Sequence, residues 1–567
     1  MVETTSEPQP SILGLSQPAP VALDQGASVA DSPDDVKFKP TWRILGIFVV
    51  LILLSFLSAL DASIIATSLP TITREIGGQD VYVWIANSYL FAATVPQPFY
   101  GQIANVFGRR NPFFVSLVLF LFGSGLAGGA HNAATLIAAR VIQGLGSGGI
   151  YVLPEIIMCD VVPPRHRGPY LSALLSTAAL ATTIGPIIGG AIAQSNWRWI
   201  FWINLPISGV AIIAMAILLR VTYRRSQTWR DALLRVDFLG NAIFIPSMIS
   251  LFFGLIMGGN SSAGFAWSSF RVIVPLVLGT LGWVAFHIHQ ASPLCREPSM
   301  PPRLFKHRTS MAGFLMIFLA SSFSQAASFF LPIYFQAVKG STPLMSGVQY
   351  LPFTIAILIL AGIAAGFLSK TGHYRPIHWA GWALGAVGAG LLSTLDEKSS
   401  TGAWIGFQII AAGGVAFVFT VSLPSTLAAL EESDVAVATG TYAFLRTFGL
   451  VWGVTISSVT FNSQVNAHLN AITDVSVRQL LANGAAYSFA SGDGSEHIGD
   501  LPEPSKTQVI HVYVLAMRVV WLVFAGISAV GFFLTFIERH IDLRKHHTTE
   551  FGLAEQKTSV NTEVEEK

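Results

Sequence analysis

Long apolar stretches, separated by short polar ones, repeat along most of this chain. A helix needs about 20 mostly apolar residues to cross a bilayer, and by that measure the pattern predicts fourteen membrane-spanning helices. An even number of spans places both ends of the chain on the same side of the membrane. The predicted spans are centred near Leu53, Tyr89, Phe120, Gly146, Ala181, Ala211, Ser250, Leu278, Ser322, Ile357, Leu384, Ala412, Val451 and Phe524.

The positive charges between the predicted spans indicate which side that is. Loops after the even-numbered spans, up to the twelfth, contain fifteen Lys and Arg residues, whereas the opposite loops contain seven. Cytoplasmic loops of membrane proteins carry the excess of positive charge. We therefore expect both termini to be cytoplasmic, with a disordered N-terminal tail over residues 1–41 that contains no secretory signal.

Composition agrees with a membrane protein built from helices alone. Hydrophobic residues make up 52% of the chain, charged residues only 11%, and the mean hydropathy is +0.58, whereas soluble domains carry about a quarter charged residues. The net charge of +2 gives no reason to expect a nucleic-acid partner. Cys159 and Cys295 are too few for a disulfide framework or a metal site. The chain is thus predicted to be an all-α polytopic membrane protein.

Ionisable residues within the apolar stretches are the first candidate functional residues. A charged group at membrane depth costs about 3 kcal/mol or more, so it needs a partner, a water-filled cavity or a function. Asp61, in the first span, is a candidate for binding and releasing a proton as a cavity opens to either side. The alternative is that Asp61 anchors neighbouring helices through hydrogen bonds to Ser and Thr hydroxyls.

The fourth span places Arg140 and Gln143 on one helix face, next to small residues such as Gly144. A guanidinium group stays protonated, so we expect Arg140 to influence a nearby carboxylate rather than to carry a proton itself; a purely structural ion pair is the alternative. Glu155 lies fifteen residues further along the helix, about 22 Å away, and cannot pair with Arg140. It is either a second proton-binding site or a structural acid.

Two motifs rich in glycine lie in the first half of the chain. The loop between the second and third spans contains Gly101, Asn105, Gly108, Arg109 and Arg110, where glycine permits a tight turn and arginine marks a cytoplasmic surface. The fifth span contains a glycine-proline motif that predicts a kinked helix with close neighbours. It forms either a hinge between helix bundles or an ordinary packing contact. Its residues are Gly185, Pro186, Gly189 and Gly190.

Taken together and in this order, these motifs resemble those of the major facilitator superfamily, within it the fourteen-span drug:proton antiporter branch found in fungi. The resemblance implies six-helix bundles over residues 42–220 and 311–537, with two extra spans and their cytoplasmic connectors over 221–310. It also implies an outer loop at 462–511 and a cytoplasmic C-terminal tail at 538–567.

One position departs from the family pattern. The loop motif usually has an acidic residue where this chain has Asn105, so a charged contact at the cytoplasmic gate is absent or reduced to a hydrogen bond. Arg446, in the second half, is either a charged residue of the cavity or gate, or a structural partner of an acid.

The resemblance and the residues together predict a secondary active transporter, not an enzyme and without a cofactor, that exports hydrophobic toxins or drugs by proton antiport through alternating access. Iron-siderophore uptake and vacuolar transport of basic amino acids are the alternatives, and a nutrient-sensing receptor is a remote one. We expect a monomer in the plasma membrane, or else in the vacuolar membrane. Asn260 is a weak glycosylation candidate. The expected substrate cavity contains Trp84, Asn87, Tyr89, Gln143, Phe330, Tyr334, Gln336 and Arg446.

Overall fold

The computed structural model describes residues 40–77, 82–219, 229–258, 265–482 and 498–543, together with positions 486 and 489. Predictions for the N-terminal tail before residue 40, for Asn260 and for the chain after residue 543 lie outside the described residues. In the described ranges the chain is helical, and the one β-type contact is a single bridge between Gly258 and Phe265. The all-α expectation is therefore confirmed for this part of the chain.

A first set of helices, called here the N-terminal group, packs together through α1 against α6, α4 against α5 and α2 against α5. Side-chain caps fix where several helices begin: Asn132 Oδ1, for example, accepts a hydrogen bond from the Thr135 N–H at the start of α5. The group consists of α1 (Trp42–Ile76), α2 (Tyr82–Thr94), α3 (Gln97–Phe107), α4 (Arg110–Gly128), α5 (Ala133–Val161), η1 (Pro164–His166), α6 (Arg167–Asn196), α7 (Trp199–Trp202) and α8 (Asn204–Leu218).

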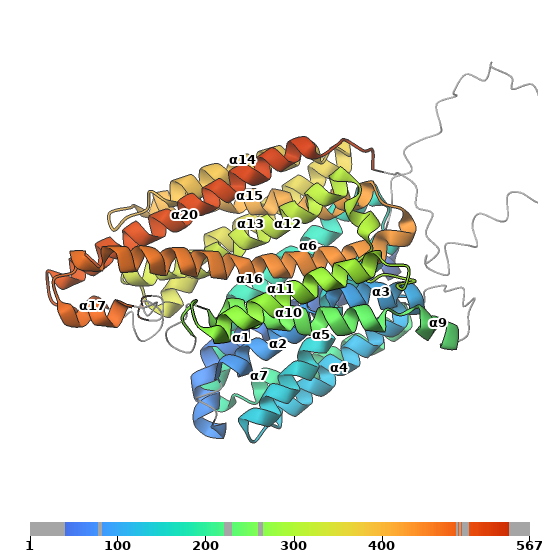
Figure 1. Cartoon of the computed structure of the whole chain (residues 1–567), viewed down its shortest axis with the longest axis horizontal. Helices are drawn as coiled ribbons and strands as arrows, with labels where there is room; N and C mark the ends of the chain where they lie inside the picture. Colours follow the sequence, from blue (N-terminus) through green and yellow to red (C-terminus); the bar gives the residue numbers. More distant parts are fainter. Residues whose placement is uncertain are drawn as a thin grey trace, which may run out of the picture. The chain divides into compact units, whose positions relative to one another are not determined.

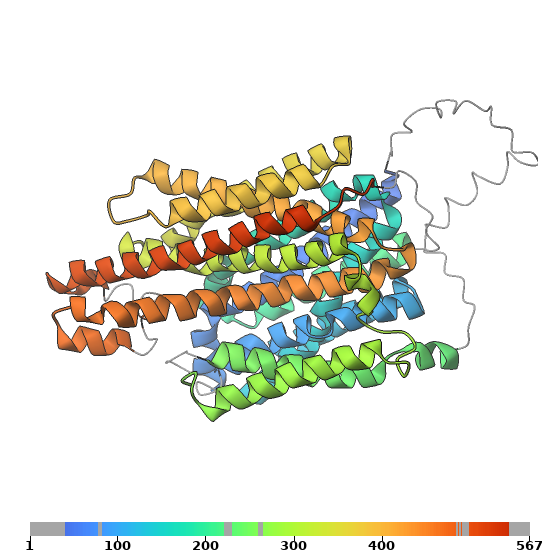
Figure 2. The ribbon, with the colours of Figure 1, turned by 45° about the horizontal axis from the view of Figure 1, so that its top comes forward.

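A second set, the C-terminal group, packs through α12 against α16, α14 against α15 and α20, and α13 against α15. Figure 2 shows these helices in yellow to red, running alongside one another. They are α12 (Arg308–Ile333), η3 (Tyr334–Val338), α13 (Pro343–Thr371), α14 (Arg375–Leu392), α15 (Thr401–Ala428), η4 (Glu432–Asp434), α16 (Val435–His468), η5 (Leu469–Ala471), α17 (Val475–Leu481) and α20 (Ser505–Ile537).

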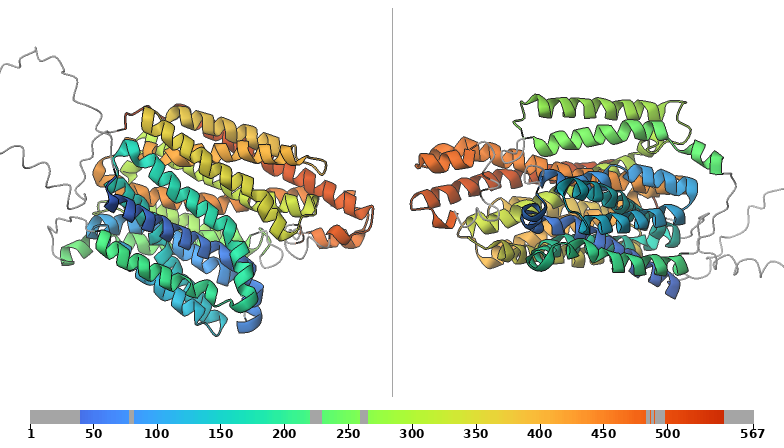
Figure 3. Two further views of the ribbon diagram at one scale, coloured as in Figure 1. Left: turned by 180° about the vertical axis from the view of Figure 1, so that it is seen from behind. Right: turned by 90° about the horizontal axis from the view of Figure 1, so that it is seen from below.

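Between the two groups the chain forms α9 (Trp229–Arg235), α10 (Phe238–Met257), α11 (Phe270–Ala291) and the short η2 (Pro302–Phe305). Helices α10 and α11 pack side by side on one flank of the bundle, as the right-hand view of Figure 3 shows in green. Aromatic side chains attach α10 to both groups. Phe253 stacks on Trp84 of α2 at 5.5 Å, and Phe244 meets Phe444 of α16 at 5.2 Å between ring centroids.

Each of the fourteen predicted span centres lies within a helix. Among the described residues, eleven helices are long and apolar enough to cross a membrane by length and composition. The predicted spans without such a helix correspond to α2 with α3, to α6 and to α14. The helical membrane architecture is therefore supported, while the number fourteen and the side on which the termini lie remain predictions.

The end of the bundle at which α3 passes to α4 is called here the Gly108 end, and the opposite end, where α6 finishes, the Trp197 end. The Gly108 end is on the right in Figure 1, near the labels α3 and α9. There the two groups meet closely, because α3 packs against α16 and α6 against α13. Asn105 Nδ2 donates to the Ser433 carbonyl at 3.0 Å.

Candidate functional site

The most extensive polar cluster in the N-terminal group surrounds Asp61 of α1, whose exposed fraction is 2%. Arg140 Nη1 lies 2.5 Å from Asp61 Oδ2. Gln143 Nε2 and Asn204 Nδ2 donate to the other carboxylate oxygen, at 2.9 and 2.8 Å. Both amide groups also donate to Ser124 Oγ, at 2.8 and 3.3 Å. Helices α1, α4, α5 and α8 thus enclose one buried ion pair whose acid is fully hydrogen-bonded.

Arg140 is completely buried and lies against aromatic rings. Its guanidinium carbon is 4.1 Å from the centroid of the Tyr89 ring and 5.8 Å from that of Phe201. The Tyr89 hydroxyl donates to the Ser58 carbonyl at 2.9 Å, which fixes the ring in place. Arg140 Nε and Nη2 have no hydrogen-bond partner among the described residues. The cluster therefore holds two donor nitrogens free to bind an acceptor.

The glycine-proline motif of α6 packs against α1, the helix that contains Asp61. A Cβ atom on Gly185 would lie 1.9 Å from Ser63 Oγ of α1, so a larger residue there would force the Ser63 side chain to move. Four residues on, the Gly189 carbonyl accepts a hydrogen bond from Ser68 Oγ at 3.1 Å. Helix α6 continues without a break through Pro186 and Gly190, although the proline side chain lies outside the described atoms. The motif joins α6 to α1 within one group.

A second buried ion pair joins the two groups. Arg446 Nη1 of α16 lies 2.5 Å from Glu155 Oε1 of α5, and both side chains are less than 10% exposed. Glu155 Oε2 and the hydroxyl of Tyr442 have no hydrogen-bond partner among the described residues. Slightly farther from the Gly108 end, Gln97 and Thr447 also hydrogen-bond across the same interface. Glu155 thus pairs with an arginine of the other group, not with Arg140.

The loop motif between α3 and α4 completes the contact at the Gly108 end. A Cβ on Gly101 would lie 2.7 Å from the Ala436 carbonyl oxygen, so this glycine allows α3 to touch α16. Gly108 ends α3 with φ of 78°, a conformation that favours glycine. Arg109 Nε pairs with Asp160 Oδ2 at 2.7 Å and Arg109 Nη1 donates to Asn105 Oδ1, whereas Arg110 is exposed.

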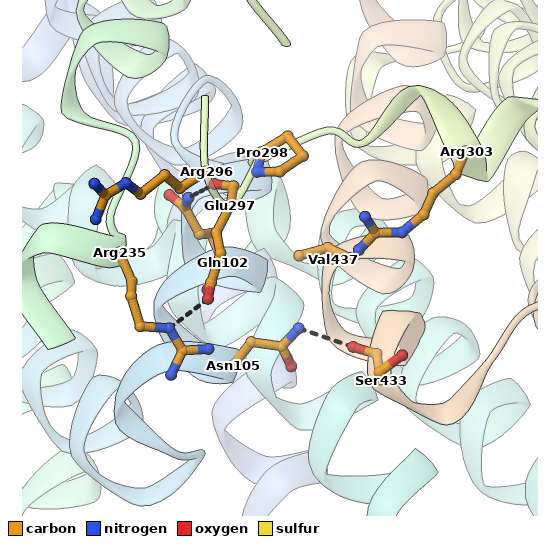
Figure 4. Close-up of a pocket in the computed structure, with 9 residues that line it drawn as sticks. All are labelled: Gln102, Asn105, Arg235, Arg296, Glu297, Pro298, Arg303, Ser433 and Val437. Carbon is orange, nitrogen blue, oxygen red and sulfur yellow. Dashed lines mark hydrogen bonds and ion pairs between the residues drawn. The ribbon is translucent and has the colours of Figure 1, made fainter. Parts of the chain in front are cut away.

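A cavity of about 310 Å³ opens beside this contact, at the Gly108 end of the bundle. Figure 4 shows that side chains from α3, from the segment after α11 and from η4 and α16 surround it. Arg303 reaches its edge from one side and Arg235 from the other. The lining residues are Gln102, Asn105, Arg235, Arg296, Glu297, Pro298, Arg303, Ser433 and Val437.

The extra helices carry a separate polar cluster at the start of α10. Asp237, His289 and Cys295 offer metal-ligand atoms within 4.8 Å of one another, a grouping that their spacing in the sequence did not indicate. The carboxylate of Asp237 already accepts hydrogen bonds, including one at 2.8 Å from the N–H of Gly240, which it caps. Burial raises the pKa of Asp237, but its hydrogen bonds, first that to His289, outweigh burial and lower the pKa. We assign no ion to this saturated helix cap.

The structure brings together only some of the predicted cavity residues. Tyr89 and Gln143 meet at the Asp61 cluster, whereas Trp84 stacks against α10 and Asn87 is half-buried on α2. Three others lie near the Trp197 end of the C-terminal group: Phe330 is fully buried against Phe461, the Tyr334 hydroxyl donates to the Asp396 carbonyl, and Gln336 donates to Ser346. Their contact with a substrate remains a prediction.

Sequence reasoning missed two partners of Asp61. Asn204 follows the aromatic residues of α7, and Ser124 is a hydroxyl in an apolar span; neither was among the candidate residues. A neutral amide at the start of an apolar helix was the available signal, because such a group at membrane depth also needs a partner. The pairing of Glu155 with Arg446, 291 positions apart, had no local signal.

Comparisons with known proteins agree with this architecture. The family model described as Major Facilitator Superfamily matches residues 51–454. An MFS efflux transporter from Aspergillus oryzae is 45% identical over 524 residues, covering 92% of this chain and 94% of the relative. An efflux pump from Gibberella moniliformis is 43% identical over 555 residues, covering 97% of both chains.

Two solved structures show the same fold at low sequence identity. The human organic anion transporter MFSD10 aligns with a TM-score of 0.54 at 14% identity, covering 88% of this chain and all of the other. The proton:xylose symporter XylE aligns with a TM-score of 0.55, also at 14% identity, covering 87% and 95%. These likenesses concern the fold alone.

Proposed function

Since the chain belongs to the major facilitator superfamily, and is therefore a multi-pass membrane transporter of small molecules rather than an enzyme, we propose that it exports hydrophobic small molecules by proton antiport. Several full-length relatives are named as efflux pumps or efflux transporters, which supports the direction. The observation that carries the coupling is the buried Asp61–Arg140 pair. The cargo is a toxin, a secondary metabolite or a drug.

Asp61 is the proton-binding group in this proposal. A proton on its carboxylate neutralises the charge and removes the attraction to Arg140, which stays cationic. The hydrogen bonds from Gln143 and Asn204 hold the acid in place whether or not it is charged. Proton binding to Asp61 therefore weakens its ion pair with Arg140, and release of the proton restores the pair. In this proposal the proton and the cargo bind to this cluster in alternation.

Alternating access requires the two groups to separate at one end and then at the other. The ion pair between Glu155 and Arg446 closes the Gly108 end, together with the contact of α3 and α16. Opening this end breaks the pair and leaves two charges at membrane depth, which costs several kcal/mol unless water or a proton reaches Glu155. Glu155 is thus the second proton-linked group of the proposal.

The orientation belongs to the same proposal. We place the Gly108 end and both termini in the cytoplasm, because the loops at that end carry the excess of positive charge. Fourteen spans then form two six-helix bundles with α10 and α11 as the additional pair. The transporter acts as a monomer in the plasma membrane.

The test is accumulation of a panel of hydrophobic toxins and fluorescent dyes in cells with and without the protein, repeated with a protonophore. We expect lower accumulation in cells that contain the protein, and we expect the protonophore to abolish the difference. Asp61→Asn should lose the gradient-driven export while leaving expression and cargo binding intact, because the amide keeps the shape but cannot release a proton.

Glu75→Gln is the matched control on the same helix. Glu75 is 55% exposed and pairs with Arg198 at the Trp197 end, so loss of its charge should not change export. Gradient-driven export by Asp61→Asn would remove Asp61 from the coupling role. Higher accumulation in cells with the protein would instead indicate uptake, and siderophores and basic amino acids would then be tested.

A further inference from the structure

The segment between α11 and α12 crosses the surface of the bundle at the Gly108 end. Residues Glu297 to Arg303 of this segment are called here the strap. They border the cavity of Figure 4 and lie between α3 of the N-terminal group and η4 of the C-terminal group. Each end of the strap makes specific polar contacts with a different group.

The first end is attached to Gln102 of α3, which is 1% exposed. Gln102 Nε2 donates to the Glu297 carbonyl, and Ser299 Oγ donates back to Gln102 Oε1 at 2.9 Å. One amide side chain therefore uses both its donor and its acceptor on the strap. Arg235 of α9 also pairs with the Glu297 carboxylate.

The second end is attached to Asp434, immediately before α16. Arg303 Nε and Nη2 approach the two carboxylate oxygens at 2.9 and 2.7 Å, in a bidentate arrangement. Asp434 is 6% exposed at its side chain, whereas Arg303 is 58% exposed. The hydrogen bond to Asp434 raises the pKa of Arg303. Because the carboxylate is largely desolvated, removal of the arginine leaves it without its charged partner.

The strap is short between these attachments. From Ser299 to Arg303 the chain can span at most about 14 Å, at about 3.5 Å per residue. Pro301 and Pro302 restrict its φ angles. Leu304, fully buried, anchors the turn that follows. A span longer than this limit would require the turn to unwind and expose the leucine.

The middle of the strap is fixed to the extra helices. Asn241 of α10 donates to Ser299 Oγ at 2.8 Å, and the Met300 N–H donates to Gln290 Oε1 of α11 at 3.0 Å. Helix α10 in turn packs on both groups through its aromatic side chains. The extra helices and the strap are therefore one connected element across the interface that opens.

We propose that the strap holds the cytoplasmic ends of the two groups together, and that Gln102 and Arg303 are its positioning residues. The proposal rests on the alternating-access mechanism proposed above. The bidentate pair with Asp434 supplies a charged contact near the place where Asn105 makes only a hydrogen bond. Opening of the Gly108 end then requires one end of the strap to detach.

Spin labels test this directly. In a chain with Cys159→Ser and Cys295→Ser, cysteines replace Asn111 of α4 and Thr371 of α13, two exposed positions at the Gly108 end. Pulsed electron paramagnetic resonance in lipid nanodiscs then measures the distance between the two spin labels, one on each group. We expect one dominant short distance, and a population of longer distances that rises up to about fivefold in Gln102→Ala or Arg303→Ala, as for the loss of a partly exposed ion pair.

The double variant separates a strap from two independent contacts. If one tether links the groups, detaching the second end adds nothing, so Gln102→Ala with Arg303→Ala should match the stronger single variant; additive shifts would overturn the proposal. Lys306→Ala, which removes an exposed charge from the same turn, should leave the distances unchanged. Unchanged distances in both single variants would also overturn it.

Two further variants guard against simple misfolding. Arg303→Lys keeps the charge but loses the bidentate geometry, and should give an intermediate shift. Exchange of the charges, by Arg303→Asp with Asp434→Arg, should restore the short distance. These measurements use neither cargo nor a proton gradient. If the strap proposal is wrong, the export test is unaffected, and if the export proposal is wrong, the spin-label distances still test the strap.

Discussion

Two of the buried ion pairs differ in what they connect. Asp61 and Arg140 both belong to the N-terminal group, and three donors saturate the carboxylate. Glu155 and Arg446 belong to different groups, and one oxygen of Glu155 has no partner among the described residues. The first pair lies within one group, whereas the second pair is part of the interface between the groups. The same chemistry therefore joins helices inside one group in one place and joins the two groups in the other.

Arg140→Ala should have the largest effect, and this effect should be a loss of folding stability. It leaves the Asp61 carboxylate buried without its cation, a loss of about 3–5 kcal/mol in the free energy of unfolding. Denaturant titration in detergent, followed by tryptophan fluorescence, measures this loss. The exposed Arg110→Ala should stay within about 0.5 kcal/mol of the parent. Addition of Asp61→Asn should recover most of the loss, and a double variant as unstable as Arg140→Ala would contradict the assignment of the pair.

Glu155→Gln should have a smaller effect, and this effect should be on the balance between the closed and open states of the Gly108 end. The amide still accepts a hydrogen bond from Arg446 but lacks the charge, so the closed Gly108 end loses about 1–3 kcal/mol relative to the open state. The spin-label distance between positions 111 and 371 should shift towards longer values, with little change in unfolding. Exchange of the charges, by Glu155→Arg with Arg446→Glu, should reverse the shift. Destabilised folding with unchanged distances would mean that the Glu155–Arg446 pair is structural.

The smallest effect is expected at the Asp237 cluster on the extra helices, outside both groups. Burial first, and then the Asp237 carboxylate, raise the pKa of the half-buried Cys295 to about 12. About one thiol in ten thousand is then ionised at pH 8, and reactivity rises as the pH approaches 12.

Asp237→Asn removes the negative charge of the carboxylate and therefore lowers the pKa of Cys295. Iodoacetamide should therefore modify Cys295 several-fold faster at pH 8, in a Cys159→Ser background, while the spin-label distances stay unchanged. Equal rates in both proteins would show that the carboxylate has no influence on the thiol. A change in the distances would mean that this cluster also belongs to the interface.

The helices could be predicted from the sequence because membrane thickness sets their length. Apolar runs of that length locate α1, α4 and α5 without knowledge of their neighbours. Helix geometry also showed correctly that Glu155 is too far along α5 to reach Arg140, and the structure gives it Arg446 instead. The fourteen-span count is harder at α14, because its 18 residues include many small or polar side chains and give a weaker hydropathy signal.

The partners of the candidate residues could not be predicted in the same way. Asp61 and Arg140 were each candidates, but their contact depends on how α1 and α5 rotate against each other, which packing decides. Asn204 follows an aromatic segment that gives no sign of a buried acid nearby. The strap was read only as a connector, since Gln102 and Arg303 lie 201 positions apart and no periodicity relates them.

The position of α10 and α11 makes the two flanks of the transporter unequal for a cargo dissolved in the bilayer. On one flank this pair lies against α2 and α16 through aromatic side chains. On the other flank α6 and α13 pack directly together, and α13 exposes Ile355, Ile359 and Ile363 to lipid. A hydrophobic molecule that diffused laterally within the membrane would meet α10 and α11 first on one flank and the α6–α13 contact directly on the other. Bilayer partitioning and direction of approach would then contribute to selectivity before any binding site is reached.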